Sequence, residues 1–150
     1  MFRKASLVSL TLFVGMALTP ALTGGAFAVD DDTSTGSVDL SSVRTKIKVG
    51  SYAAALEELR GLAEDSQQAD VYNLLGYTLR KTGDFATSLT YYRKALELRP
   101  DYRAAREYLG ELYVETGNIS KAKEQLAALV KLCPSGCEER DDLEKALEGK

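Results

Sequence analysis

The feature that most constrains the fold is an internal repeat of 34 residues. The segment KTGDFATSLTYYRKALELRPDY, residues 81–102, aligns with ETGNISKAKEQLAALVKLCPSG, residues 115–136, at an offset of 34. Upstream, KVGSYAAALEELRGLAED, residues 48–65, aligns with the first of these segments at an offset of 33. The glycines that coincide in the three segments are Gly50, Gly83 and Gly117. A fixed period of this length indicates that one supersecondary unit is stacked several times along the chain.

The spacing of apolar residues predicts helices through most of the chain. Beyond Asp39, apolar residues recur at helical spacing almost to the C-terminus, and short breakers interrupt them. The breakers are Gly50-Ser51, Gly83-Asp84, Arg99-Pro100-Asp101, Gly117-Asn118 and Pro134-Ser135-Gly136. Helices of about a dozen residues joined by such tight turns form antiparallel hairpins. The sequence therefore predicts an all-α fold.

The residues inside the repeat resemble the tetratricopeptide repeat (TPR) family, whose helix-turn-helix unit has a period of 34 residues. In residues 69–102 the family pattern is met by Tyr72, Leu75, Gly76, Leu79, Ser88, Tyr92, Ala95 and Pro100. In residues 103–136 it is met by Leu109, Gly110, Tyr113, Ala122, Leu126 and Pro134, with departures at Arg106 and Leu129. Residues 38–68 form a degenerate unit, in which Val43 replaces the packing glycine and Gln67 the proline.

The resemblance implies a short right-handed α-solenoid of stacked hairpins over residues 38–148. It implies a degenerate repeat at 38–68, full repeats at 69–102 and 103–136, and a capping helix at 137–148. In such repeats a small residue lets the two helices of one hairpin approach closely, which is the role expected of Gly76 and Gly110.

The capping helix is expected to close the end of the array. Leu143, Ala146 and Leu147 share one face of this segment, while its other face is charged, as suits the last helix of an open solenoid. Ser135 and Glu138 have the spacing of a capping box, which predicts that the helix starts just before Cys137.

The resemblance also implies a partner-binding groove lined by the first helix of each hairpin. The candidate partner-binding residues are Asn73, Tyr77, Arg80, Lys81, Glu107 and Glu111. Some family members clamp a C-terminal carboxylate with basic and asparagine side chains. Tyr77 and Glu107 occupy positions where that clamp needs Asn or a base, so we expect the clamp to be absent. The expected partner is an unidentified protein or peptide, and the degenerate first hairpin allows a homo-oligomer.

The cysteines, Cys133 and Cys137, flank the turn Pro134-Ser135-Gly136 and allow more than one interpretation. Two cysteines do not by themselves complete a four-ligand zinc site, and the chain has no histidine, so we expect no metal. A redox pair is an alternative, because Cys137 begins a helix, although the C-x3-C spacing and the neighbouring acids oppose it. A disulfide that staples the capping helix to the last repeat is the favoured interpretation.

The first residues predict export. Arg3 and Lys4 precede an apolar run, and Ala26-Phe27-Ala28 matches a small-x-small cleavage pattern. We therefore expect a signal peptide at 1–28, cleavage between Ala28 and Val29, and a flexible linker at 29–37. An uncleaved anchor is the alternative, but the run is shorter than the roughly 20 residues that span a bilayer. From this signal peptide we expect a periplasmic or secreted protein without a stable membrane span.

Composition limits the functional classes that remain. Removal of residues 1–28 changes the formal charge from −3 to (19 − 2) − 22 = −5, which does not suit nucleic-acid binding. Without histidine, the chain lacks the Ser-His-Asp and Cys-His catalytic arrangements. We therefore expect a non-enzymatic interaction module without a cofactor, an adaptor in a bacterial cell envelope. A thiol-disulfide protein and a scaffold without a defined groove are the alternatives.

Overall fold

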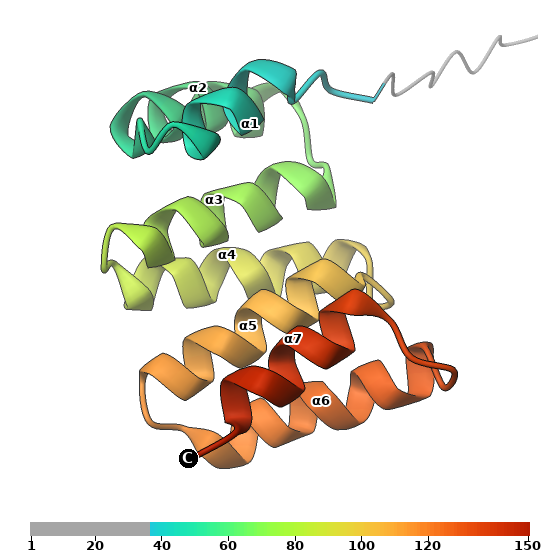
Figure 1. Cartoon of the computed structure of the whole chain (residues 1–150). Helices are drawn as coiled ribbons and strands as arrows, with labels where there is room; N and C mark the ends of the chain where they lie inside the picture. Colours follow the sequence, from blue (N-terminus) through green and yellow to red (C-terminus); the bar gives the residue numbers. More distant parts are fainter. Residues whose placement is uncertain (1–36) are drawn as a thin grey trace, which may run out of the picture. The chain divides into compact units, whose positions relative to one another are not determined.

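The structure, a computed structural model, describes residues 37–150, and these residues form seven helices and no strand. The helices are α1 (Ser41–Lys48), α2 (Tyr52–Asp65), α3 (Ala69–Lys81), α4 (Phe85–Leu98), α5 (Arg103–Glu115), α6 (Ile119–Leu132) and α7 (Glu138–Leu147). Helices α1 to α6 form three successive hairpins, and α7 follows them (Figure 1). The prediction of an all-α hairpin array is confirmed.

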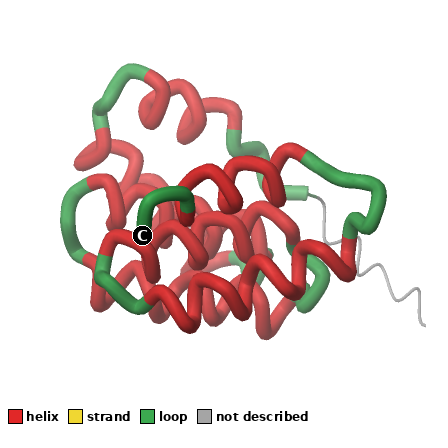
Figure 2. The backbone as a smooth tube through the Cα atoms, turned by 60° about the horizontal axis from the view of Figure 1, so that its bottom comes forward, coloured by secondary structure: helices red, strands yellow, loops and turns green. Residues whose placement is uncertain are grey.

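The repeated glycines end the first helix of each hairpin. Gly50, Gly83 and Gly117 have φ angles of 75°, 85° and 75°, a left-handed conformation that glycine adopts without steric cost. After α3, the Gly83 amide donates to the Arg80 carbonyl and the Asp84 amide donates to the Leu79 carbonyl. This pair of hydrogen bonds is a Schellman motif, and α1 and α5 end in the same way. The repeat in sequence is therefore a repeat of one tight turn, and Figure 2 shows the short loops that result.

Close packing inside the second hairpin depends on Gly76. A Cβ atom placed there would lie 2.7 Å from the ring of the buried Tyr92 on α4. Beside it, the Ser88 hydroxyl donates a 2.7 Å hydrogen bond to the Gly76 carbonyl. The small residues thus bring α3 and α4 together, as the repeat pattern predicts.

Gly110 has a different neighbour from the one expected. A Cβ atom at Gly110 would lie 2.4 Å from Leu143 Cδ2, on α7, rather than against α6. The glycine of the last repeat therefore makes room for the capping helix, because Leu143 inserts over α5 and is fully buried.

The Cys133–Cys137 disulfide lies in the turn between α6 and α7 and joins Cα atoms 6.0 Å apart. The expected disulfide is present, and α7 packs on α5 and α6. The capping box is not formed: Cys137 directly precedes α7 in an extended conformation, and no side chain caps the helix. Ser135 lies too early for that role, because the turn through Gly136 moves the helix start to Glu138.

The core consists of two clusters of buried side chains that divide the array along its length. The first joins α1, α2 and α3 through Leu40, Val43, Leu56, Leu59, Val71, Leu74, Leu75 and Leu79. The second joins α4, α5 and α6 through Tyr92, Leu109, Leu112, Tyr113 and Ala122. Helix α1 packs chiefly on α2, and α2 packs on α3.

Several predictions concern residues 1–36, which lie outside the described part of the chain. They are the signal peptide at 1–28, the cleavage site between Ala28 and Val29, and the linker up to residue 36. Within residues 37–150, none of the helices is long and apolar enough to cross a bilayer.

Candidate functional site

An open pocket of about 240 Å³ lies between the first helices of all three hairpins. Its lining residues are Arg44, Ile47 and Lys48 from α1, Leu74 and Tyr77 from α3, and Tyr108 from α5. We call this the tyrosine pocket. Apolar and aromatic side chains beside a few polar groups are the usual composition of a binding site.

Two tyrosines and a set of cations define the chemistry of the tyrosine pocket. The rings of Tyr77 and Tyr108 lie 5.0 Å apart at an interplanar angle of 58°. The Nζ atom of the exposed Lys81 is 5.3 Å from the centre of the Tyr77 ring, within cation–π range. Arg44 and Lys48 are exposed and have no ion-pair partner among residues 37–150. The pocket therefore offers aromatic surface and unpaired positive charge together.

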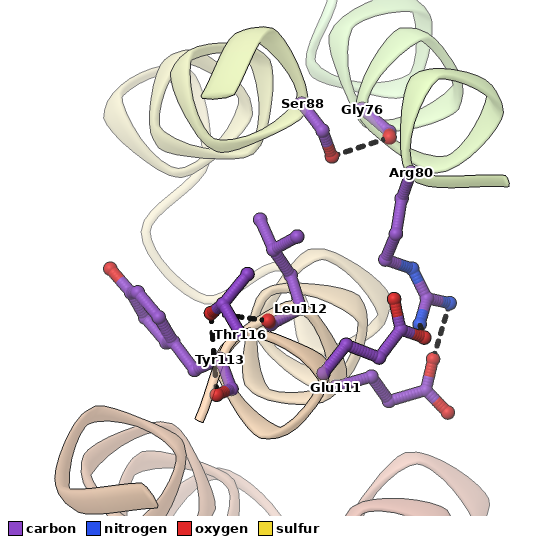
Figure 3. A network of polar contacts seen from close by, with 8 residues as sticks. Gly76, Arg80, Ser88, Glu111, Leu112, Tyr113 and Thr116 are labelled. Atoms are coloured by element: carbon purple, nitrogen blue, oxygen red, sulfur yellow. Dashed lines mark hydrogen bonds and ion pairs between the residues drawn. The ribbon is translucent and has the colours of Figure 1, made fainter. Parts of the chain in front are cut away.

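Arg80 is not free to meet a partner, because it is already paired. Its side chain is 3% exposed and reaches from α3 to α5, where it bonds Glu111 (Figure 3). It also bonds Glu115 at 2.7 Å. Glu111 and Glu115 lie one helical turn apart, so one guanidinium reaches both. This corrects the expectation of an accessible groove cation at Arg80: it links the second hairpin to the third.

Asn73 is also buried and already hydrogen-bonded within the array. It is 3% exposed, and its Nδ2 atom donates to the Tyr102 hydroxyl at 3.3 Å. That hydroxyl in turn donates a 2.6 Å hydrogen bond to Asp70. Although burial opposes ionisation, hydrogen bonds from Tyr102 and Arg99 lower the pKa of Asp70. The network fastens α3 to the segment that precedes α5, and it takes Asn73 away from the open groove.

Glu107 is the most perturbed carboxyl group of the site. It is 7% exposed and has neither a hydrogen bond nor an ion pair among the described residues. Burial raises the pKa of Glu107 to about 8, and the nearby carboxylates of Glu111, Asp142 and Glu139 add to this. Arg80 opposes the increase. Glu107 therefore lies under the surface of an acidic region formed by α5 and α7.

Of the six predicted partner-binding residues, only Tyr77 lines the tyrosine pocket, and Lys81 lies against its ring. Sequence reasoning missed Arg44 and Lys48, although the repeat contains the signal that finds them. At the offset of 33, 44 + 33 = 77 and 48 + 33 = 81, so these residues are the equivalents of Tyr77 and Lys81 in the degenerate first unit.

The array geometry and the comparisons point to the same type of helical repeat. Residues 79–132 match the tetratricopeptide repeat family. This segment runs from the end of α3 through α6. These residues are therefore similar to that family, and the hairpin array has a TPR-like fold.

The relatives in sequence are two proteins described as uncharacterized protein ycf37. The one from Guillardia theta is 33% identical over 63 residues, which cover 42% of this chain and 35% of the relative. The one from Pyropia yezoensis is 31% identical over 55 residues, or 37% of this chain and 31% of the relative. The chain thus matches about a third of the length of these curated relatives.

Two solved structures resemble the array in fold. The first TPR of Spaghetti (RPAP3), determined bound to the HSP90 peptide SRMEEVD, gives a TM-score of 0.62 at 19% identity, covering 70% of this chain and 84% of that one. MamA gives a TM-score of 0.58 at 22% identity, covering 71% and 70%. At these identities the likeness shows the fold alone.

Proposed function

We propose that this chain is a non-enzymatic interaction module that binds a protein or peptide over the tyrosine pocket. The observation that carries the proposal is the pocket itself. The first helices of three hairpins bring Tyr77, Tyr108 and the cations Arg44 and Lys48 to one open surface. Tyrosine and arginine are among the residues that most often anchor protein contacts. A similar array, that of RPAP3, was solved with a peptide bound, which supports a peptide ligand here.

The experiment is affinity capture on the whole chain, comparing wild type with Tyr77→Ala. Tyr91→Ala is the matched control, because Tyr91 is also half-buried and also contacts a single other ring, that of Tyr72, on a different part of the array. A partner bound over the pocket is lost with Tyr77→Ala and kept with Tyr91→Ala. Identical captured proteins for all three chains contradict the proposal. Arg80→Glu is unsuitable, because it breaks the buried contacts with Glu111 and Glu115.

We further propose export to the periplasm or cell surface, so the partner is an envelope protein. The support is the sequence of residues 1–28, with Arg3 and Lys4 before an apolar run and a small-x-small site. N-terminal sequencing of the chain purified from its host tests this: a start at Val29 is expected. An intact Met1 in the soluble cytosolic fraction contradicts it.

A further inference from the structure

The charge at equivalent positions of the array reverses along its length. Arg44 in the first hairpin corresponds to Tyr77 in the second and to Glu111 in the third, since 44 + 33 = 77 and 77 + 34 = 111. One turn later on the same helices, Lys48 corresponds to Lys81 and to Glu115, since 48 + 33 = 81 and 81 + 34 = 115. The surface therefore has a basic end on α1, an aromatic centre on α3, and an acidic end on α5.

Helix α7 extends the acidic end. Glu139 and Asp142, both on α7, are near enough to Glu107 to raise its pKa. Glu139 lies 3.6 Å from Arg103, whereas the exposed Asp142 has no ion pair within residues 37–150. Glu111 keeps a quarter of its side chain exposed despite its contact with Arg80. The acidic end thus retains negative charge that a partner can reach.

The tyrosine pocket, between these two ends, has the size for one side chain. Its volume of about 240 Å³ is below the roughly 300 to 1,000 Å³ of sites that enclose a whole small molecule. Ile47 and Leu74 supply aliphatic contacts, and the tilted rings of Tyr77 and Tyr108 supply aromatic ones. Such a pocket accommodates an apolar or aromatic anchor.

We propose that the array binds an internal, extended segment of its protein partner in one direction. An apolar side chain fills the tyrosine pocket, an acidic residue on one side of it pairs with Arg44 and Lys48, and a basic residue on the other side faces Glu111 and Asp142. The segment is internal because the chain has to continue past the anchor in both directions to meet both ends. This inference rests on the proposed function and specifies the chemistry of the partner.

Charge complementarity is the reason to prefer this occupant. Arg44 and Lys48 lack ion pairs among the described residues, so a partner carboxylate does not have to break an existing ion pair. A polyanion is disfavoured, because a phosphate backbone that reached α1 would continue over the acidic end. Electrostatic matching of this kind sets orientation and suppresses reversed binding.

The test is selection of peptides from a random 12-residue display library by the full chain. We expect the selected peptides to share an aromatic or aliphatic residue with acids on one side and bases on the other, in one order. Selection by Arg44→Glu/Lys48→Glu should lose the acid preference or replace it with Lys and Arg. The matched control is Arg93→Glu/Lys123→Glu, the same charge reversal at exposed positions of α4 and α6, which should keep the wild-type pattern.

Synthetic peptides then measure how strongly the array prefers one charge order over the other. The consensus peptide and its charge-reversed counterpart, of equal composition and with both ends blocked, should differ at least about tenfold in affinity for the wild-type chain, or about 1.4 kcal/mol. Equal affinity for the two peptides overturns the inference. An acid preference that survives Arg44→Glu/Lys48→Glu, or the absence of any enriched peptide, also overturns it.

If the selected peptides show no fixed charge order but Tyr77→Ala still abolishes capture, the proposed function stands and the directional inference fails. A wild-type dimer that Arg44→Glu/Lys48→Glu dissociates would instead assign the pocket to a second copy.

Discussion

Two glycines within helices of this array differ in what surrounds them. Gly76, on α3, faces the ring of Tyr92 at a distance that leaves no room for a Cβ atom. Gly61, on the exposed surface of α2, has nothing within 4 Å of such an atom. Glycine is therefore required by packing at position 76, whereas at position 61 it only lowers the helix propensity of α2.

We expect opposite effects from alanine at these two glycines. Gly76→Ala should destabilise the fold by about 1 to 3 kcal/mol, because the added methyl group pushes α4 away from α3. Gly61→Ala should stabilise it by about 0.5 to 1 kcal/mol, because alanine restricts the unfolded chain and favours helix. Urea unfolding followed by circular dichroism measures both. Equal effects of the two substitutions would contradict the packing role of Gly76.

Glu107 predicts a pH dependence of stability. Its pKa is raised to about 8 in the folded chain from an ordinary value of 4.5, so between these values the folded chain holds a proton that the unfolded chain releases. Stability from this group is therefore greatest below pH 4.5, falls as pH rises, and reaches its lower limit above pH 8. The slope is at most about 1.4 kcal/mol per pH unit.

Glu107→Gln removes this titration, so the variant should gain most over wild type at pH 9 and little at pH 4.5. Urea unfolding at pH 4.5, 6.5 and 9 measures the difference. Glu124→Gln, the same substitution at an exposed position of α6, is the control for the loss of one carboxyl group. A Glu107→Gln effect that is the same at all three pH values would show that folding does not raise the pKa of Glu107.

At the scale of elements, the turn between α6 and α7 decides how the array ends. The disulfide crosses the turn, and Leu143 anchors α7 over Gly110. Helix α7 has no side-chain cap at its start, and Leu143 is its one fully buried side chain. The covalent link adds to its packing on α5 and α6.

We expect Cys133→Ser/Cys137→Ser to lower stability by roughly 2 kcal/mol, the chain-entropy value for so short a loop. Thermal unfolding with and without reductant measures this. Reductant should lower the melting temperature of wild type to that of the variant and leave the variant unchanged. If stability does not change in either comparison, the staple has no structural role and the redox alternative gains support.

At the scale of the whole molecule, the array has a strong middle and two weaker ends. Helices α3, α4 and α5 have neighbours on both sides, whereas α1 packs chiefly on α2, and α7 forms the other end. In a linear array each unit is stabilised by its immediate neighbours, so the terminal units open first.

Amide hydrogen exchange should reveal this gradient. We expect slow exchange in α3 to α5 and faster exchange in α1 and α7. Reduction of the disulfide should speed exchange in α7 and leave α1 unchanged, which makes α1 an internal control. Uniform exchange across residues 37–150 would instead indicate that the array opens as one cooperative unit.

The repeated features of the array can be read from the amino-acid sequence alone. Helical spacing, the 34-residue period and the turn glycines Gly50, Gly83 and Gly117 are local, because each hairpin turn is closed by residues within one unit. The pairing of Cys133 and Cys137 was predictable for the same reason, since only a short turn separates them. The turn glycine and the helical spacing are present even in the degenerate first unit.

Which polar side chains remain accessible depends on how the hairpins pack, and the sequence pattern does not reveal it. Arg80 meets Glu111 and Glu115 on the next hairpin, so its burial depends on the register between units. Asn73 meets Tyr102, 29 residues away at the far end of the same repeat, so its burial depends on how that repeat folds back on itself. The tyrosine pocket exists because α1, α3 and α5 bring Arg44, Tyr77 and Tyr108 together from three hairpins. A repeat pattern fixes the conformation of each unit, but the contacts between units depend on side chains that the pattern leaves free to vary.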